Sequence, residues 1–452
     1  MSRREGPRVQ LDDVTPDESA ALHAVLAERA VTPVLQPVAD VVTGEVVGLE
    51  ALARGPAGPV ERPDRLFAAA RAEGLVHDLD DLCRRRAVEV ADEAGLSGPF
   101  GLFVNVEPEA APVDVTPGPA SVRLLDRGVT VVLELTERDL TGDPGRLLAF
   151  AEAARAEGFR IALDDVGAEP ASLALMPFLR PEVVKLDLSL VQGRDPGEVA
   201  EIVSAVAAYA EQSDAIVLAE GVETADQLAT ARGLGATLAQ GWWVGTPEPA
   251  ADVVPGLVPP RVPPRFRLRM PEAVPHSPFQ TVARSRTARR APKSLLVAVS
   301  RHLERQAAAQ GDLAVVLAAY EDAENLTPGS RRRYRDLAAS AAFVGVLGRG
   351  VAAEPEPGVR GADLLAEDPV NGEWDIAVVG PHFAAALVAR DLDPDGDPGD
   401  PAREFDHVLT HDRTLVLEVA RSLMARVVPH RVRNATDVTD ASPVGVASGT
   451  RA

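Results

Sequence analysis

The sequence predicts an α/β protein with two domains: a β/α (TIM-like) barrel that contains one antiparallel strand, and a smaller C-terminal α/β domain. From about Val31 to Pro249, apolar strand-like runs alternate with Ala-, Leu- and Arg-rich helical stretches, as in repeated βα units. One early connection in this region is too short for a helical crossover. A proline-rich stretch, Val258–Pro292, then interrupts the pattern before a second α/β segment begins.

Composition limits the classes of function. The 452 residues suffice for two or three domains, and 46% hydrophobic residues suffice for real cores. A net charge of −22 repels nucleic acid polymers and anionic membranes, so a phosphate-bearing ligand needs a local cation or metal. We find no spanning run of about 18 apolar residues and no signal-peptide core, and we expect a cytoplasmic protein without membrane insertion. Cys83, the only cysteine, excludes an internal disulfide and is expected to be buried.

The chain divides into five predicted parts. By residue number they are a polar lead-in (1–27), the barrel (28–255), a Pro/Arg-rich linker (256–292), the second α/β domain (293–430) and a disordered tail (431–452). Proline density predicts no regular helix or strand in the linker. The linker is basic, and a solvated linker is favoured over one that docks on an acidic face or binds a polyanion.

The short connection predicts a hairpin at the start of the barrel. Only "VADVVTGEV" separates the first apolar run from the second, and Thr43–Gly44 is typical of a tight turn. Counting outward from this turn places Gln36 nearly opposite Glu50. The first strand therefore runs against the others and still brings Gln36 to the same rim.

Helices are expected between the later strands, where apolar residues recur at helical spacing. The predicted helices are Pro63–Leu75, Asp80–Ala94, Pro144–Ala156, Ala171–Leu179, Glu198–Ala210 and Ala225–Gly233. Gly158 and Gly235 follow two of them and are typical of helix C-terminal stops.

A polar residue ends every predicted strand of the barrel. These residues are Gln36, Glu50, Asn105, Glu134, the pair Asp164 and Asp165, Lys185, Glu220 and Gln240. The carboxyl ends of the parallel strands of a barrel form one rim, which carries the chemistry in this architecture. The sequence therefore predicts an oxygen-rich cluster with a single lysine at one rim.

Such a cluster favours a site for two divalent cations. Carboxylate and amide oxygens without histidine or cysteine suit Mg²⁺ or Mn²⁺. Adjacent acids would let Asp164 bridge two ions while Asp165 binds one, and Lys185 would add a cation beside a phosphodiester. Taken singly, an acid at a strand end is more often a helix cap or solvated, Asn105 could be a turn former, and Asp187 could simply pair with Lys185. The whole set favours the metal site.

These residues lie in motifs that resemble the EAL domain, a family of cyclic-di-GMP phosphodiesterases. The resemblance begins at "VLQPVADVVTGEVVGLEALARGP", which contains Glu50–Ala51–Leu52, and continues in order through "FVNVEP", "LELTE", "ALDDVG", "VVKLD", "LAEGVET" and "AQGWWVGTP". It covers about Val31 to Pro249. It implies a β/α barrel with one reversed strand, in agreement with the predicted hairpin.

The resemblance also implies roles for individual residues in the hydrolysis of cyclic di-GMP to linear pGpG. One Mg²⁺ or Mn²⁺ would be held by Glu50, Asn105, Glu134 and Asp164, and the second by Asp164, Asp165 and Glu220. Catalytic roles would fall to Lys185, which orients the water, and to Glu220 and Glu50. Gln36, Arg54 and Gln240 would contact the dinucleotide. Supporting roles would fall to Glu137, Glu223 and Asp187.

The chain departs from the family pattern directly after Asp165. The run Val166–Gly167–Ala168–Glu169–Pro170 has Glu169 where the family has a glycine and Pro170 where it has an aromatic residue. Glycine permits backbone angles that glutamate mostly cannot adopt, and proline fixes φ. This loop resembles the family's dimerisation and activation loop, so a homodimer through the barrel is implied. Altered dimerisation, weaker turnover or a receptor role are open.

The C-terminal segment resembles the DICT sensory domain. The resemblance rests on "KSLLVAVSRHLERQA", "TPGSRRRYRDLA", "EWDIAVVGPHFAAALVARDL" and "FDHVLTHDRTLVLEVARSLMARV". We expect strands at Ile376–Val379 and Val408–Leu409, each followed by an amphipathic helix. Trp374 is expected in the core, and Arg331–Arg333 on a solvated helix face. The histidines lack metal-ligand spacing and are expected in ordinary polar roles: His302, His382, His407 and His411. The ligand or partner that this domain senses is left open.

Three functions follow, from different classes. The first is a bacterial second-messenger phosphodiesterase that a sensory domain regulates. The second is a catalytically weak or inactive cyclic-di-GMP receptor, against which Lys185 and the full acid set argue. The third is a nucleotide-independent scaffold, against which Gln36 and Arg54 argue.

Overall fold

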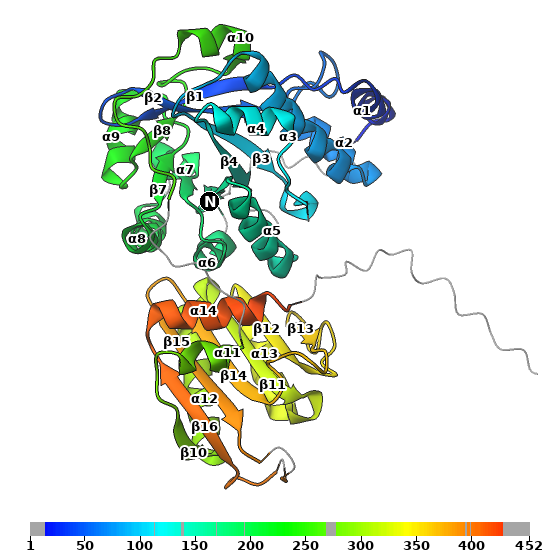
Figure 1. Cartoon of the computed structure of the whole chain (residues 1–452), viewed down its shortest axis with the longest axis vertical. Coiled ribbons are helices and arrows are strands. Elements are labelled where there is room, and N and C mark those ends of the chain that lie inside the picture. The colour runs from blue at the N-terminus through cyan, green and yellow to red at the C-terminus, as the bar shows by residue number, and fades with distance from the viewer. Residues whose placement is uncertain are drawn as a thin grey trace, which may run out of the picture.

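The computed structural model describes residues 14–427 except 113, 137–139, 169, 194, 268–276, 394–395 and 398; the side chains of 170, 171 and 196 are also left out. Two sheets organise these residues, one of nine strands and one of seven. They form two domains that lie one above the other in Figure 1. The predicted tail, 431–452, lies outside the described residues.

The nine-stranded sheet closes into a barrel. Its strands are β1 (Val34–Asp40), β2 (Val46–Leu52), β3 (Gly101–Val106), β4 (Thr130–Leu135), β5 (Arg160–Val166), β6 (Val183–Leu186), β7 (Ile216–Ala219), β8 (Leu238–Gln240) and β9 (Glu248–Pro249). Strands β2 to β8 are parallel and in chain order, whereas β1 pairs antiparallel with both β2 and β8. Gln36 lies directly opposite Glu50. The predicted barrel and its single reversed strand are confirmed.

Helices surround the barrel. They are α1 (Pro16–Glu28), α2 (Pro63–Glu73), α3 (Val76–Glu93), η2 (Pro108–Ala110), α4 (Pro119–Asp126), α5 (Pro144–Ala156), α6 (Pro170–Leu179), α7 (Leu188–Gln192), α8 (Pro196–Ser213), α9 (Ala225–Gly233), α10 (Ala250–Val253) and η3 (Val254–Gly256). All six predicted helices are confirmed, with α3 and α8 longer than expected. Gly158 and Gly235 have positive φ, as a helix stop requires. Cys83 is buried, as expected.

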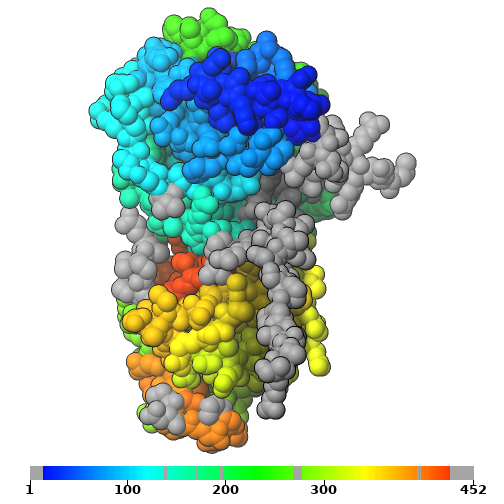
Figure 2. Space-filling view, turned by 90° about the vertical axis from the view of Figure 1, so that its right-hand side faces the viewer, coloured from blue at the N-terminus to red at the C-terminus, as the bar shows by residue number. Residues whose placement is uncertain are grey.

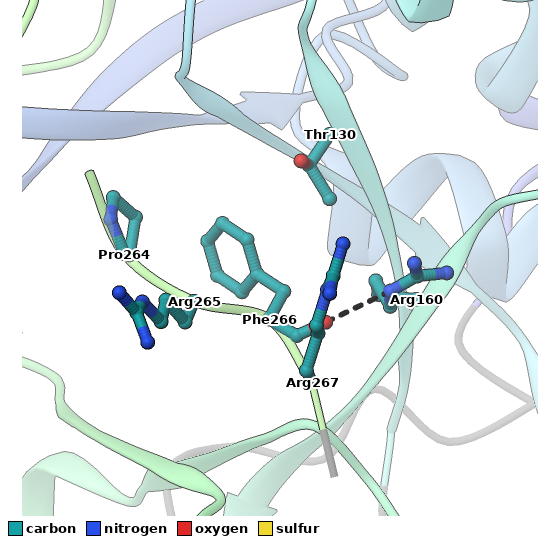
Figure 3. A pocket seen from close by; sticks show the side chains of 6 residues that line it. All are labelled: Thr130, Arg160, Pro264, Arg265, Phe266 and Arg267. Carbon is teal, nitrogen blue, oxygen red and sulfur yellow. Dashed lines mark hydrogen bonds between the residues drawn. The ribbon is translucent and has the colours of Figure 1, made fainter.

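The proline-rich linker is more ordered than predicted. Phe266 is 5% exposed and packs edge-on against Phe103, with ring centroids 6.0 Å apart, among side chains that fill the barrel interior. Figure 3 shows Phe266 beside Arg160, whose Nε donates to the Phe266 carbonyl at 2.8 Å. The expectation of a solvated linker is therefore wrong at this residue. The first residues of the parallel strands form the end of the barrel opposite the rim, which we call its lower end. Apolar side chains would be exposed there, and the aromatic ring of Phe266 removes them from water.

The end of the linker also differs from the prediction, because it contains a helix, α11 (Pro278–Ala283), and a strand, β10 (Arg289–Pro292). Proline excludes neither: Pro278 lies in the first turn of α11, and β10 is an edge strand. Both elements belong to the second domain, where β10 pairs with β16 (Glu404–Thr410).

The second domain is built on the seven-stranded sheet. Its other strands are β11 (Val315–Asp322), β12 (Phe343–Arg349), β13 (Arg360–Asp363), β14 (Glu373–Val379) and β15 (Ala384–Asp391), in the order β10-β16-β15-β14-β11-β12-β13. Its remaining helices are α12 (Lys293–Gln310), η4 (Gly311–Leu313), η5 (Ala323–Asn325), α13 (Pro328–Ala338) and α14 (Arg413–Met424). The α14 helix follows β16, as predicted.

The predicted helix after Ile376–Val379 is wrong. A hairpin leads instead from β14 into β15, closed by a hydrogen bond from Gly380 N to Phe383 O of 2.8 Å. The run "AAALVARD" favours helix by propensity, but β15 is an inner strand of the sheet and is buried for most of its length. Tertiary burial overrides the local preference.

Helices cover both faces of this sheet. Leu296 and Leu303 of α12 and Tyr334 of α13 share one apolar cluster with alternate residues of the central strands. Val282 of α11 and Val416 of α14 belong to the cluster on the other face. Within the described residues, none of the helices is long and apolar enough to cross a membrane.

The α14 helix lies between the two domains (Figures 1 and 2). Arg421 of α14 pairs with Glu152 of α5 at 2.5 Å. The guanidinium of Arg360 donates to the carbonyl oxygens of Thr141 (3.0 Å) and Gly142 (2.9 Å), in the connection between β4 and α5. The second domain thus contacts the segment that follows a rim strand of the barrel.

Candidate two-metal site at the barrel rim

A bulge at the end of β5 brings two neighbouring acids to the same rim. The pairing of β5 with β6 shifts register between Leu163 and Val166. Asp165, inside this shift, has φ of 52°, in the left-handed region that non-glycine residues seldom occupy. Side chains of a regular strand would alternate between faces. The bulge instead allows both carboxylates to lie at the rim, at the cost of a strained residue.

The rim acids form two groups that share one member. Glu50, Glu134 and Asp164 offer carboxylate oxygens that all lie within 4.8 Å of one another, and Asp164, Asp165 and Glu220 do the same. Asp164 is the common member. All three members of the first group are buried, whereas Asp165 and Glu220 of the second are half-buried. Two adjacent carboxylate clusters with a shared aspartate could accommodate a pair of divalent cations.

Lys185 lies among these acids. Its Nζ atom is 2.8 Å from Glu220, 2.9 Å from Glu134, 2.9 Å from Asp164 and 3.6 Å from Glu50, and its side chain is 1% exposed. One ammonium cannot balance four carboxylates, so the described cluster would carry an excess of negative charge if all four acids were ionised. This excess is what bound cations would neutralise.

Burial and charge shift the pKa values of the cluster in different directions. Burial raises the pKa of Glu134 and of Glu220 well above the ordinary range, and neighbouring carboxylates add to the shift. Burial also raises the pKa of Asp164, and Lys185 only partly offsets this. For Glu50 burial is outweighed by Lys185 and by hydrogen bonds from Gln240 and Asn105, so its pKa is lowered. The acids raise the pKa of Lys185 well above its usual value despite burial.

Amide side chains fix the position of Glu50. Gln240 Nε2 donates to Glu50 Oε2 at 2.5 Å and to Gln36 Oε1 at 3.0 Å, and Asn105 Nδ2 donates to Glu50 Oε1 at 3.1 Å. Gln36 Nε2 in turn donates to the carbonyl oxygen of Gly245 at 3.1 Å. The reversed strand β1 therefore contributes to the same network as the parallel strands.

The donor set fits hard divalent cations. Both groups consist of carboxylates alone, with Asn105 beside the first group. Both oxygens of Glu134 are buried without a hydrogen bond among the described residues, and Lys185 is the ion partner of one of them. Oxygen-only sites of this kind suit Mg²⁺ or Mn²⁺ better than zinc.

The other predicted site residues lie outside the two groups. Arg54 is half-buried and donates to the carbonyl of Ala53 at 2.8 Å. Asp187 accepts from Ser189 N at 2.9 Å and caps α7, whereas the ion pairs of Lys185 are with the four rim acids. Glu223 is exposed, and Glu137 lies outside the described residues.

Two tryptophans near the rim were missed in the sequence. Trp242 and Trp243 follow Gln240 after a single glycine and are 69% and 52% exposed. Large exposed aromatic side chains beside a polar site are suited to stacking on a planar ligand. The "GWW" run directly after a predicted rim residue was the available signal.

The departure from the family pattern leads directly into α6. Glu169 lies outside the described residues, and Pro170 is the first residue of α6. Proline is well suited to the first turn of a helix, because its fixed φ is helical and its missing N–H needs no partner there. Gly167 keeps a φ of 106°, and a Cβ atom at that position would meet Ile202 at 3.0 Å. The glycine requirement thus survives at Gly167.

Comparison with known families gives two matches. The model of the EAL domain matches residues 19–247, and that of the DICT domain, a sensory domain in diguanylate cyclases and two-component systems, matches residues 278–392. The chain is 33% identical over 224 residues to the cyclic di-GMP phosphodiesterase NbdA of Pseudomonas aeruginosa, covering 48% of this chain and 29% of NbdA. It is 28% identical to the probable cyclic di-GMP phosphodiesterase PdeN of Escherichia coli, covering 50% and 45%.

Solved structures with similarity to the barrel include two ligand complexes. The Klebsiella pneumoniae BlrP1 complex with manganese and cyclic di-GMP is 28% identical, with a TM-score of 0.41 and coverage of 48% of this chain and 56% of that one. The PaMucR phosphodiesterase complex with cyclic di-GMP is 26% identical, with a TM-score of 0.42 and coverage of 52% and 99%. The chain spans less than half the length of NbdA and PdeN.

Proposed function

Since this chain belongs to the EAL domain family, we propose that its barrel hydrolyses cyclic di-GMP to linear pGpG in a reaction that depends on Mg²⁺ or Mn²⁺. The relatives that are named cyclic di-GMP phosphodiesterases support this substrate. One observation carries the proposal: two carboxylate clusters share Asp164 and surround Lys185. If these side chains served only to stabilise the fold, the burial of so many acids around one lysine would add little stability.

The proposed metal ligands follow the two clusters. Glu50, Asn105, Glu134 and Asp164 would hold one ion, and Asp164, Asp165 and Glu220 the other. Bound ions would supply positive charge beside the phosphodiester and lower the pKa of a water molecule. Bound ions would replace the protons on the carboxylates. The site can therefore contain buried acids whose pKa values are raised in the absence of metal.

The chain's own residues would orient the reaction. Lys185 remains an ammonium, because the acids around it raise its pKa, so it would donate hydrogen bonds to the attacking water and to the phosphate. Glu220, a half-buried acid of the second group, would accept a proton, and Glu50 would keep its position through Gln240 and Asn105.

The substrate would lie across the open side of the rim. Arg54 would contact a phosphate, and Gln36 and Gln240 would contact the dinucleotide from the floor of the site. The exposed rings of Trp242 and Trp243 are candidates for stacking on guanine. Glu137, Glu223 and Asp187 would have supporting roles, and for Asp187 this role is the cap of α7.

Regulation by the C-terminal domain is part of the proposal. Its support is the set of contacts from Arg421 to Glu152 and from Arg360 to Thr141 and Gly142. Arg360→Ala should lower kcat severalfold and leave metal binding intact, whereas Arg349→Ala, in the same domain and half-exposed, should not change kcat. An unchanged kcat in Arg360→Ala would contradict regulation through this contact.

A homodimer through the barrel stays a prediction that sedimentation can test.

The decisive assay separates the enzyme from the receptor. The full chain should convert cyclic di-GMP to pGpG with Mn²⁺ or Mg²⁺, Glu50→Ala should not, and Glu45→Ala, at the other end of the same hairpin, should. Binding without turnover under either metal would favour the receptor, for which the replacements at Glu169 and Pro170 are the specific observation. Neither binding nor turnover would favour the scaffold.

A further inference from the structure

A cavity lies in the C-terminal domain, away from the barrel. Its volume is about 160 Å³, and it is lined by one face of α12, by the start of α13 and by the ends of the inner strands β11, β14, β15 and β16, which meet at one end of the sheet. It lies on the sheet face that α12 and α13 cover, opposite the face that carries α14 and the contacts with the barrel.

The interior of the cavity is charged but balanced. Arg333 pairs with the buried Glu304, with Nε 2.5 Å from Oε2, and Arg403 pairs with Asp391. This corrects the expectation of a solvated face for Arg333, whose guanidinium reaches inward to Glu304. Because each of these arginines already has a carboxylate partner, an anion would gain little from them and would lose its hydration. The lining also contains Lys293 and Arg301 together with Glu321 and Glu373, so it has as many basic as acidic residues, and this balance favours a ligand without net charge.

The apolar wall is aromatic. Trp374 and Phe405 pack edge to face with centroids 5.8 Å apart, and both line the cavity together with Tyr320. Trp374 is thus not purely a core residue. Aromatic rings prefer edge-to-face or offset contact with another planar ring. A cavity of about 150 Å³ holds one benzene ring, so there is room here for a single ring.

One buried hydroxyl in the wall needs a partner. Ser300 is 6% exposed and lines the cavity, and its Oγ makes no hydrogen bond among the described residues. A buried polar group without a partner is costly, and a ligand that supplies the missing hydrogen bond removes that cost.

We propose that this cavity binds a small, uncharged ligand with one planar ring that carries hydrogen-bonding groups. The proposal does not depend on the activity of the barrel, because none of the cavity residues belongs to the rim. The aromatic wall would contact the ring, Ser300 would form a hydrogen bond with it, and the two ion pairs would border the site.

The test uses the tryptophan in the wall as the reporter. The chain contains three tryptophans, so Trp242→Phe with Trp243→Phe leaves Trp374 as the single tryptophan in the full-length protein. Uracil is the probe, with benzoate and orthophosphate as charged comparators. We expect a saturable change in Trp374 emission with uracil and none with either comparator.

Variants on α12 show whether the signal comes from this cavity. Ser300→Ala should weaken uracil binding about fivefold, the effect of one hydrogen bond. Val297→Phe fills the cavity and should abolish binding, while Ala298→Phe, on the exposed side of the same helix, should not change it. Thermal unfolding checks that each variant is folded. If Val297→Phe does not fold, Ser300→Ala still tests whether uracil binds in this cavity.

Three results would overturn the proposal. The first is the absence of a saturable response to uracil at millimolar concentration. The second is an unchanged affinity in both Ser300→Ala and a folded Val297→Phe, which would locate binding elsewhere. The third is a response to benzoate or orthophosphate but not to uracil, which would exclude an uncharged ligand.

Discussion

The Nζ atom of Lys185 lies 2.9 Å from Oε1 of Glu134, inside a barrel where neither side chain is more than 1% exposed. Buried charges are stable only in pairs, and removal of one partner commonly costs about 3–5 kcal/mol. This lysine has four acidic partners, so it is the electrostatic centre of the rim as well as a proposed catalytic group.

Lys185→Met should destabilise the metal-free protein by about 3–5 kcal/mol, because it leaves the acids without a cation. Mn²⁺ should then stabilise the variant more than it stabilises the unchanged chain. Chemical denaturation with EDTA or with Mn²⁺ measures both effects. Arg85→Met is the control, since its ion pair with Asp81 is exposed and worth about 0.5 kcal/mol. A variant that is as stable as the unchanged chain in EDTA would contradict this role.

Metal counts should follow membership of the two clusters. We expect two Mn²⁺ per chain, one in Glu134→Gln, one in Asp165→Asn and fewer than one in Asp164→Asn, measured by calorimetric titration. Asp187→Asn should still bind two ions, because Asp187 caps α7. Equal counts in Asp164→Asn and Glu134→Gln would show that Asp164 is not shared.

The backbone strain at Asp165 has a measurable cost. Asp165→Gly and Asp165→Ala remove the same carboxylate, but only glycine adopts a φ of 52° without penalty. The glycine variant should be more stable than the alanine variant by about 1 kcal/mol in urea denaturation. If alanine were as stable as glycine, the left-handed conformation at this position would be in doubt.

Phe266 closes the lower end of the barrel, so Phe266→Ala should destabilise the protein by about 3–5 kcal/mol through lost burial and the cavity left beside Phe103. Its exposed neighbour supplies the control: Arg265→Ala should change the free energy of unfolding by less than about 0.5 kcal/mol. Equal, small effects of the two substitutions would mean that the linker does not dock.

Glu373 should make the stability of the C-terminal domain depend on pH. Burial raises its pKa to about 7, above the ordinary 4.5, despite a hydrogen bond from Phe279 N and the nearby Arg390 and Arg426. Between these values the folded state binds more protons than the unfolded state. Stability should therefore rise as pH falls from 7 towards 4.5, by at most about 1.4 kcal/mol per pH unit for one proton.

Glu373→Gln should reduce this slope. Trp374 emission in the variant without Trp242 and Trp243 reports the unfolding of this domain. Asp375, buried beside Glu373, also has a raised pKa, through burial and then through Glu373, so a residual slope is expected. An unchanged slope in Glu373→Gln would exclude Glu373 as its source.

Features that depend on local chain geometry could be predicted from the sequence. The turn at Thr43–Gly44 was enough to place Gln36 opposite Glu50, and strand-end positions identified the acids that the two clusters contain. Features that depend on distant contacts could not be. The left-handed angle of Asp165 depends on the shifted register with β6, and Phe266 docks because the barrel has an apolar lower end.

The C-terminal domain illustrates the same limit. The residues of β15 have helical propensity, and only their position between β14 and β16 makes them a strand. Arg333 lies in a run of arginines typical of a solvated face, yet Glu304, 29 positions earlier, draws it inward. Neither the strands that flank β15 nor the carboxylate that pairs with Arg333 can be identified without the fold.

Restoration of turnover by metal tests the central claim most directly. The full chain is stripped with EDTA, dialysed, supplied with Mn²⁺ and assayed for conversion of cyclic di-GMP to pGpG, in parallel with Asp164→Asn. We predict no product in EDTA, product after Mn²⁺ is added to the unchanged chain, and none from Asp164→Asn under either condition. Turnover in EDTA, or full turnover by Asp164→Asn, would contradict a reaction that depends on two ions bridged by Asp164.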